Sequence, residues 1–87
     1  MMYEIKFTDD AVEDLQVFTR DERKQIVKAV ESELTLYPAL ESADRRRLNP
    51  NGLAEWEIRV GVARVFYDVD THNGTVKIEA VGKKLSI

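Results

Sequence analysis

The chain has 87 residues, of which 44% are apolar and 33% are charged, and its net charge is -3. This length predicts one globular domain over residues 1–87, which buries roughly 60–65% of its unfolded surface. The acidic balance excludes a uniformly basic nucleic-acid binder, although a local basic patch can lie on an acidic protein. The absence of cysteine excludes disulfides and thiolate chemistry. No apolar run approaches the roughly 20 residues of a membrane span, so we expect no membrane partner and a cytoplasmic location.

The N-terminal part of the chain predicts a strand followed by two helices. Residues 2–7 alternate apolar and polar side chains, which is the period of a half-buried strand. Thr8 is the expected N-cap of a first helix that extends to Phe18. A second helix is expected over residues 22–37, and Pro38 ends it because the residue before a proline avoids helical backbone angles. The expected core stripes of the two helices are Ala11, Val12, Leu15 and Phe18, then Ile26, Val27, Val30, Leu34 and Tyr37.

The C-terminal part predicts a meander of strands. Residues 39–49 are polar and irregular, and Asn-Pro-Asn-Gly at residues 49–52 is a strong turn signal. Three alternating segments follow, joined by the short connections Gly61-Val62 and Asn73-Gly74: residues 55–60, 63–69 and 76–81. The whole chain is therefore expected to be an α+β domain. Its N-terminal strand and helical hairpin precede a three-stranded antiparallel meander, which completes one antiparallel sheet with the helices on one face.

Alternation along the three strands separates a face under the helices from an outer face. The expected helix-side residues are Trp56, Ile58, Ala63, Val65, Tyr67, Val76 and Ile78. The expected outer-face residues are Glu55, Glu57, Arg59, Arg64, Phe66, Asp68, Lys77, Glu79 and Val81. Lys83 continues the outer-face parity of the last strand, while Gly82 leaves the direction of Lys84 open. Phe66 either stacks a nucleobase or packs under residues 39–52, and packing is the favoured interpretation.

The charges on the outer face have two interpretations. Clustered cations on a sheet face suit a polyanion or a transferring phosphate. Ion pairs across strands, each contributing roughly 0.2–1 kcal/mol, are the alternative that residue types alone favour. The expected pairs join Arg59 to Glu57 or Glu79, and Arg64 to Asp68. The run of arginines at residues 45–47 is more typical of an exposed loop than of a phosphate site. No spacing of histidines or carboxylates suggests a metal or another cofactor.

The strand segments resemble those of the bacterial RelE/ParE toxin superfamily. The matching segments are W-E-I-R-V at residues 56–60, A-R-V-F-Y-D-V at 63–69 and V-K-I-E-A-V-G-K-K at 76–84. Arg-Arg-Leu at residues 46–48 is similar to the basic residue and leucine that precede the central strands of the family. The order of strand, helical hairpin and meander matches as well, so the resemblance covers nearly the whole chain. It implies one RelE/ParE-like toxin domain of a type II toxin–antitoxin pair.

The resemblance implies two alternative activities. RelE-type toxins cleave messenger RNA in the ribosomal A site without a metal, which would make this chain a ribosome-dependent endoribonuclease that inhibits translation. ParE-type toxins inhibit DNA gyrase, and an attenuated toxin that mainly binds its antitoxin is a further alternative. A small cognate antitoxin neutralises both types, and its amphipathic segment is expected to cover the sheet face or the helical hairpin.

The resemblance also assigns roles to single residues. Arg64 and Lys84 are the expected catalytic contacts to the scissile phosphate, and Arg59 assists them. The expected RNA-binding residues are Arg46, Arg47 and Lys83. Glu57 stands where RelE-type enzymes often have a lysine, so it acts either as a base or as a carboxylate that neutralises the cations. The family's C-terminal segment, which often carries a catalytic tyrosine or histidine, has no counterpart before the sequence ends at Ile87.

Overall fold

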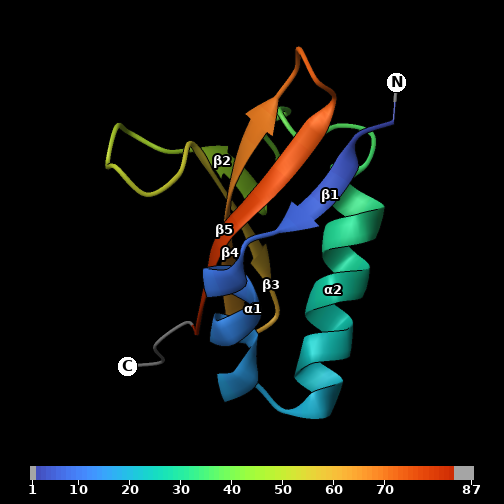
Figure 1. The fold of residues 1–87 in the computed structure, drawn as a ribbon, viewed down its shortest axis with the longest axis vertical. Helices are drawn as coiled ribbons and strands as arrows, with labels where there is room; N and C mark the ends of the chain where they lie inside the picture. The colour runs from blue at the N-terminus through green and yellow to red at the C-terminus, as the bar shows by residue number, and fades with distance from the viewer. Residues whose placement is uncertain (1, 84–87) are drawn as a thin grey trace.

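The computed structural model describes residues 2–83. Its N-terminal elements are β1 (Glu4–Phe7), α1 (Asp9–Asp14), a 3-10 turn η1 (Leu15–Val17) and α2 (Arg20–Leu34). The remaining elements are β2 (Arg45–Arg47), β3 (Trp56–Val60), β4 (Ala63–Asp70) and β5 (Thr75–Lys83). The strands form one sheet in the order β1-β5-β4-β3-β2, and α1 and α2 form a hairpin beside it (Figure 1). The α+β fold class and the meander of β3, β4 and β5 are confirmed.

The sheet is mixed, because β1 lies parallel to β5. Glu4 is opposite Thr75 and Phe7 is opposite Ile78 in this parallel pair, whereas the other neighbouring strands are antiparallel. The prediction of a wholly antiparallel sheet is therefore wrong for β1. Its alternating pattern identified a strand correctly, but alternation does not specify the direction in which a strand joins its partner.

Part of the segment predicted to be irregular forms β2. Its three arginines pair antiparallel with β3, and Arg46 lies opposite Glu57. Arg45 is 8% exposed, and its Nη1 donates hydrogen bonds to the carbonyls of Glu33 at 2.8 Å and Tyr37 at 3.0 Å. These carbonyls lie at and just beyond the C-terminal end of α2, where backbone acceptors have no intrahelical donor. Arg45 is therefore a structural residue rather than part of an exposed loop.

The two helices begin at side-chain caps and end earlier than predicted. Thr8 accepts a hydrogen bond from the backbone N–H of Ala11 at 3.0 Å, and Thr19 and Glu22 form a reciprocal capping box at the start of α2. The hydrogen bond from the Thr19 N–H lowers the pKa of the Glu22 carboxyl. α2 stops at Leu34, so Tyr37 lies outside the helix and is 63% exposed. The predicted place of Tyr37 in the core is therefore wrong.

The core lies between the helical hairpin and one face of the sheet. Tyr67 is fully buried in it, stacks on Trp56 with ring centroids 6.3 Å apart, and donates a hydrogen bond to the carbonyl of Pro38 at 2.7 Å. Burial raises the pKa of the Tyr67 hydroxyl. The predicted helix-side residues of β3, β4 and β5 are all buried, whereas Val12 of α1 is 48% exposed. No helix within residues 2–83 is both long and apolar enough to cross a membrane.

A β-bulge changes the facing of β5 after Ile78. Tyr67 pairs with Ile78, but Phe66 pairs with Ala80, so Glu79 is the extra residue of the bulge. Thr8 binds both carbonyls at this point, through its N–H to Ile78 at 3.1 Å and its hydroxyl to Glu79 at 3.2 Å. Beyond the bulge, Val81 is only 5% exposed and belongs to the core. Its predicted place on the outer face is therefore wrong, because the extra residue inverts the alternation.

Candidate nucleic-acid interface

Three adjacent strands bring arginines together on the outer face, the side of the sheet opposite the core. Arg46 of β2, Glu57 of β3 and Phe66 of β4 form one row across the strands. Arg59 and Arg64 are directly opposite each other in the next row. The antiparallel register of β2, β3 and β4 thus gathers three of the predicted site residues, Arg46, Arg59 and Arg64, around Glu57. We call these four residues the arginine cluster.

Glu57 is the buried centre of the arginine cluster. Its side chain is 1% exposed, whereas those of Arg46 and Arg64 are 54% and 41% exposed. Glu57 Oε2 lies 3.0 Å from Arg46 Nε, and Oε1 lies 2.5 Å from Arg64 Nε and also contacts Arg64 Nη2. The pairs predicted from the sequence differ, because Arg64 binds Glu57 rather than Asp68. Arg59 is exposed and has no ion pair within residues 2–83.

The guanidinium group of Arg64 also rests on an aromatic ring. It lies 5.2 Å from the ring centroid of Phe66, which is half-buried on the same face. Gly82 is opposite Arg64 on β5, and a Cβ there would lie 3.8 Å from the Phe66 ring. The Phe66 ring therefore packs against the guanidinium group of Arg64. The sequence had favoured packing of this ring under residues 39–52.

Two of the predicted RNA-binding cations lie on the other side of the sheet. Arg47 follows the helix-side parity of β2, and its guanidinium lies 5.9 Å from the ring centroid of Trp56. Lys83 has the helix-side parity that the bulge imposes, and its Nζ lies 5.8 Å from the ring of Phe18. Both residues are therefore separated from the arginine cluster. Lys84 lies outside the described residues, so its assignment stays a prediction.

A carboxyl group with an altered pKa, that of Glu79, lies near Lys77 and Asp68. Burial raises the pKa of Glu79 above its ordinary value of 4.5, and a hydrogen bond with Asp68 raises it further. Lys77 opposes this shift, with its Nζ 3.5 Å from Glu79 Oε2. Asp68 Oδ1 in turn accepts a hydrogen bond from the N–H of Glu55 at 2.8 Å. The sequence placed Glu79 on the outer face as a possible partner of Arg59, but residues 75–81 contain no glycine or other signal that marks a bulge there.

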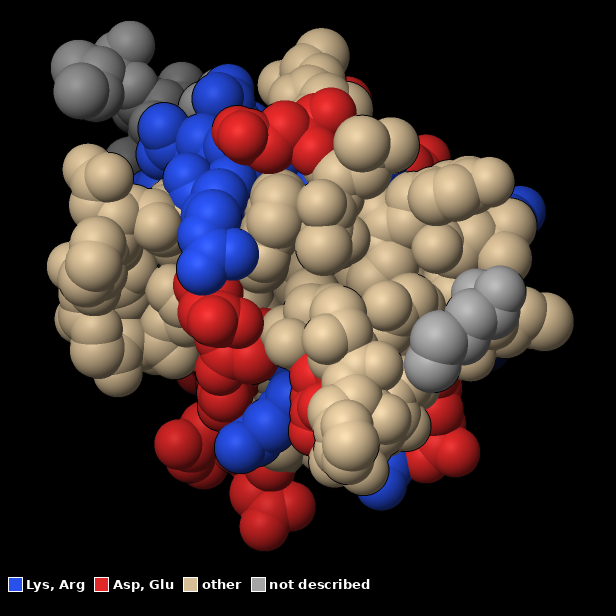
Figure 2. Space-filling model, turned by 90° about the horizontal axis from the view of Figure 1, so that it is seen from above, with Lys and Arg blue, Asp and Glu red and all other residues tan. Residues whose placement is uncertain are grey.

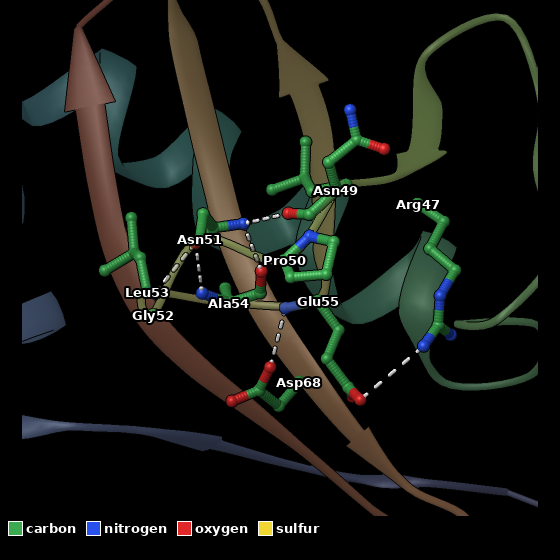
Figure 3. A pocket seen from close by; sticks show the side chains of 10 residues that line it. Arg47, Asn49, Pro50, Asn51, Gly52, Leu53, Ala54, Glu55 and Asp68 are labelled. Carbon is green, nitrogen blue, oxygen red and sulfur yellow. Dashed lines mark hydrogen bonds and ion pairs between the residues drawn. The ribbon is translucent and has the colours of Figure 1, made fainter.

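A hollow of about 410 Å³ lies between the loop after β2 and Asp68 of β4 (Figure 3). The side-chain amide of Asn51 holds this loop together, because its Nδ2 donates to the carbonyls of Asn49 and Ala54. Its Oδ1 accepts from the N–H groups of Leu53 and Ala54. The Asn51 amide is therefore occupied by hydrogen bonds within the loop. The charged residues that line the hollow are Arg47, Glu55 and Asp68.

A second hollow lies along the helical hairpin. It has a volume of about 490 Å³, with Leu15 and Val27 as its apolar residues. Its charged lining residues are Arg20, Arg23, Lys24, Lys28 and Glu31. We call this surface the basic groove, because four of its five charges are positive. Seen from above, a strip of lysine and arginine side chains continues directly into a strip of carboxylates (Figure 2).

Comparison with protein families identifies the chain. A model of the ParE toxin of the type II toxin–antitoxin system parDE matches residues 5–85. The chain belongs to this toxin family. Its membership places it in the RelE/ParE superfamily, as the strand segments predicted. A search of curated proteins gives no significant match.

Solved structures share the fold of this toxin at low sequence identity. The toxin–antitoxin complex RelBE2 from Mycobacterium tuberculosis matches with a TM-score of 0.83 and 23% identity, over 97% of this chain and all of the other. The archaeal RelE–RelB complex from Pyrococcus horikoshii matches with a TM-score of 0.78 and 20% identity, over the full length of both chains. The YoeB dimer from Staphylococcus aureus matches at 0.60 and 23% identity, again over both full lengths. At these identities the likeness establishes the fold alone.

Proposed function

We propose that this toxin is a metal-independent endoribonuclease that cleaves messenger RNA on the ribosome and so inhibits translation. The observation that carries the proposal is the arginine cluster, in which three strands present Arg46, Arg59 and Arg64 on one face. RNA cleavage through the 2′-hydroxyl places growing negative charge on the phosphorus oxygens, and fixed cations lower the energy of that transition state. An RNA-binding and catalytic surface therefore needs cations held on rigid strands, as they are here.

Within this proposal the cations have separate tasks. Arg64 binds the scissile phosphate, because it is fixed by Glu57 and Phe66 and still carries a guanidinium nitrogen, Nη1, without a partner among the described residues. Arg59 lies opposite it and assists through charge. Arg46, paired with the other oxygen of Glu57, binds the RNA backbone beside Arg64. Lys84 is proposed as a second contact to the scissile phosphate.

Induced expression in bacteria tests the proposal. We expect wild-type protein to arrest growth and to generate new 5′ ends within translated messenger RNA, and we expect Arg64→Ala and Lys84→Ala to lose both effects. Lys83→Ala is the matched control, because it removes the same charge from the helix side of the sheet. Intact messenger RNA during growth arrest, or normal cleavage by Arg64→Ala, would refute the proposal.

One observation favours a second candidate, a toxin that inhibits DNA gyrase without cleaving RNA. Arg46 and Arg64 are already paired with a buried carboxylate, which reduces the net positive charge offered to a phosphate. A protein-binding surface tolerates such pairing better than a phosphate site does. The two candidates separate in the same expression experiment, because gyrase inhibition changes plasmid supercoiling first and leaves messenger RNA ends unchanged.

We also propose that the cognate antitoxin covers the basic groove with an acidic amphipathic helix. The groove joins an apolar floor of Leu15 and Val27 to a positive rim, and such a segment complements both. Lys24→Glu with Lys28→Glu is expected to weaken antitoxin binding at least about tenfold, because two attractive charges become repulsive. The matched control is Lys24→Arg with Lys28→Arg, which keeps the charge. Equal binding of both double variants would place the antitoxin elsewhere.

A further inference from the structure

We propose that Glu57 is a positioning residue, which holds Arg46 and Arg64 side by side so that both bind one RNA phosphate. This inference rests on the proposed RNA-binding function of the outer face. Glu57 occupies the middle strand of three, with Arg46 opposite it on β2 and Arg64 diagonal to it on β4. Each of its two oxygens takes one arginine. The carboxylate is thus a bridge between side chains from two strands that do not touch each other.

The solvent exposure of Glu57, Arg46 and Arg64 determines which of their groups a ligand can contact. The carboxylate is 1% exposed, whereas about half of each guanidinium-bearing side chain reaches solvent, at 54% for Arg46 and 41% for Arg64. Arg46 uses only Nε toward Glu57, and Arg64 uses Nε and Nη2. The nitrogens that remain, both Nη atoms of Arg46 and Nη1 of Arg64, have no hydrogen-bond partner within residues 2–83. A phosphate arriving from solvent therefore meets free guanidinium N–H groups without displacing Glu57.

The size and charge of the assembly also suit a phosphodiester. Two guanidinium groups that bind the two oxygens of one carboxylate lie close enough to contact one phosphate, since a phosphodiester also offers two charged acceptor oxygens to arginine. Two arginines and one glutamate leave a net charge of +1, which balances one phosphodiester. Arg59 lies in the next row and is exposed, so it is a third cation close to Glu57, beside Arg46 and Arg64. Without the carboxylate, their mutual repulsion and their rotamer freedom would spread them apart.

The alternative role for Glu57 is masking, in which the carboxylate competes with the phosphate for the arginines. The two roles predict opposite signs for Glu57→Gln, which keeps the size of the side chain and removes its charge. Positioning predicts weaker RNA binding although the surface becomes more positive. Masking predicts tighter binding. Glu79→Gln is the matched control, because it also removes a carboxylate from the outer face but breaks no arginine pair among the described residues.

The test measures binding of a fluorescein-labelled single-stranded oligouridylate at low salt, by anisotropy, to wild type, Glu57→Gln, Glu79→Gln and Arg64→Ala. We expect Glu57→Gln to bind about tenfold more weakly than wild type, and Glu79→Gln to bind equally or slightly more tightly. A second readout is the NMR order of the Arg46 and Arg64 Nε–H groups, which are expected to be rigid in wild type and Glu79→Gln but mobile in Glu57→Gln. Backbone amide spectra of the same samples report whether the variant is still folded. The two NMR measurements together separate a loss of arginine position from a general loss of fold.

The outcomes distinguish this inference from the proposed function. Tighter or unchanged RNA binding by Glu57→Gln would overturn the positioning role, and so would rigid arginine Nε–H groups in that variant. Wild-type binding that Arg64→Ala does not weaken would instead place RNA on another surface and overturn the proposed function together with the inference. Weaker RNA binding together with mobile arginine Nε–H groups, found in Glu57→Gln but not in Glu79→Gln, supports the positioning role and the proposed function.

Discussion

Removing Arg64 is expected to destabilise the protein through the carboxylate that it leaves behind. Breaking a fully buried ion pair by removing one partner costs about 3–5 kcal/mol, because the other charge remains desolvated. Glu57 is 1% exposed, but it keeps its bond to Arg46 at 3.0 Å, and Arg64 itself is 41% exposed, so water can replace the missing guanidinium. We therefore expect Arg64→Ala to lower the free energy of unfolding by about 2 kcal/mol, which is below the range for a fully buried pair.

A double-mutant cycle with Glu57→Gln isolates this effect. If the cost comes from the unpaired carboxylate, the double variant Arg64→Ala with Glu57→Gln is more stable than Arg64→Ala alone, with a coupling of about 1–2 kcal/mol. Urea unfolding reports it through the fluorescence of Trp56, which is 4% exposed in the core and becomes solvated on unfolding. Strictly additive losses, or a double variant less stable than either single variant, would refute the reasoning. The double variant also supplies a folded protein without the Arg64 guanidinium for activity assays.

Three further predictions concern stability. Tyr67→Phe removes the buried hydrogen bond to the Pro38 carbonyl, and urea unfolding should show a loss of about 1–2 kcal/mol; an unchanged midpoint would contradict it. Gly61 has a φ of 56° and a Cβ there would lie 3.3 Å from Gln25, so Gly61→Ala should cost about 1 kcal/mol or more, whereas Gly82→Ala meets only an ordinary contact and should be nearly neutral. Glu79 has a raised pKa, so the folded state retains its proton above pH 4.5 while the unfolded state loses it, and stability falls as pH rises. Glu79→Gln should match wild type in thermal unfolding below pH 4.5 and exceed it at pH 7, and the reverse order would contradict the assignment.

The parts of the fold that depend on simple periodicity were predictable from the sequence. Alternation placed Tyr67 and Trp56 in the core, and both are buried there. Asn73-Gly74 predicted the turn between β4 and β5, where Gly74 has a φ of 67°. The same alternation placed Arg59 and Arg64 on the outer face, where the register of β3 and β4 sets them opposite each other.

The features that the sequence did not predict arise from interactions between distant segments. β2 consists of arginines alone, so no apolar alternation marks it as a strand, and its pairing comes from β3. The bulge at Glu79 is held by Thr8, 71 positions away in the sequence, and it moves Val81 and Lys83 to the helix side. Burial of Glu57 likewise needs arginines from two other strands. A glutamate on a polar face is ordinarily solvated, so its pattern gives no sign of burial.

The most direct test of the central claim is cleavage of messenger RNA on purified ribosomes programmed with a defined codon in an empty A site. Wild-type toxin is expected to cut the message at that codon in the presence of a metal chelator. Arg64→Ala, with or without Glu57→Gln, is expected to leave the message intact, while Lys83→Ala cuts normally. An intact message with folded wild-type toxin, or equal cleavage by the Arg64 variants, would contradict the claim that the arginine cluster carries the activity.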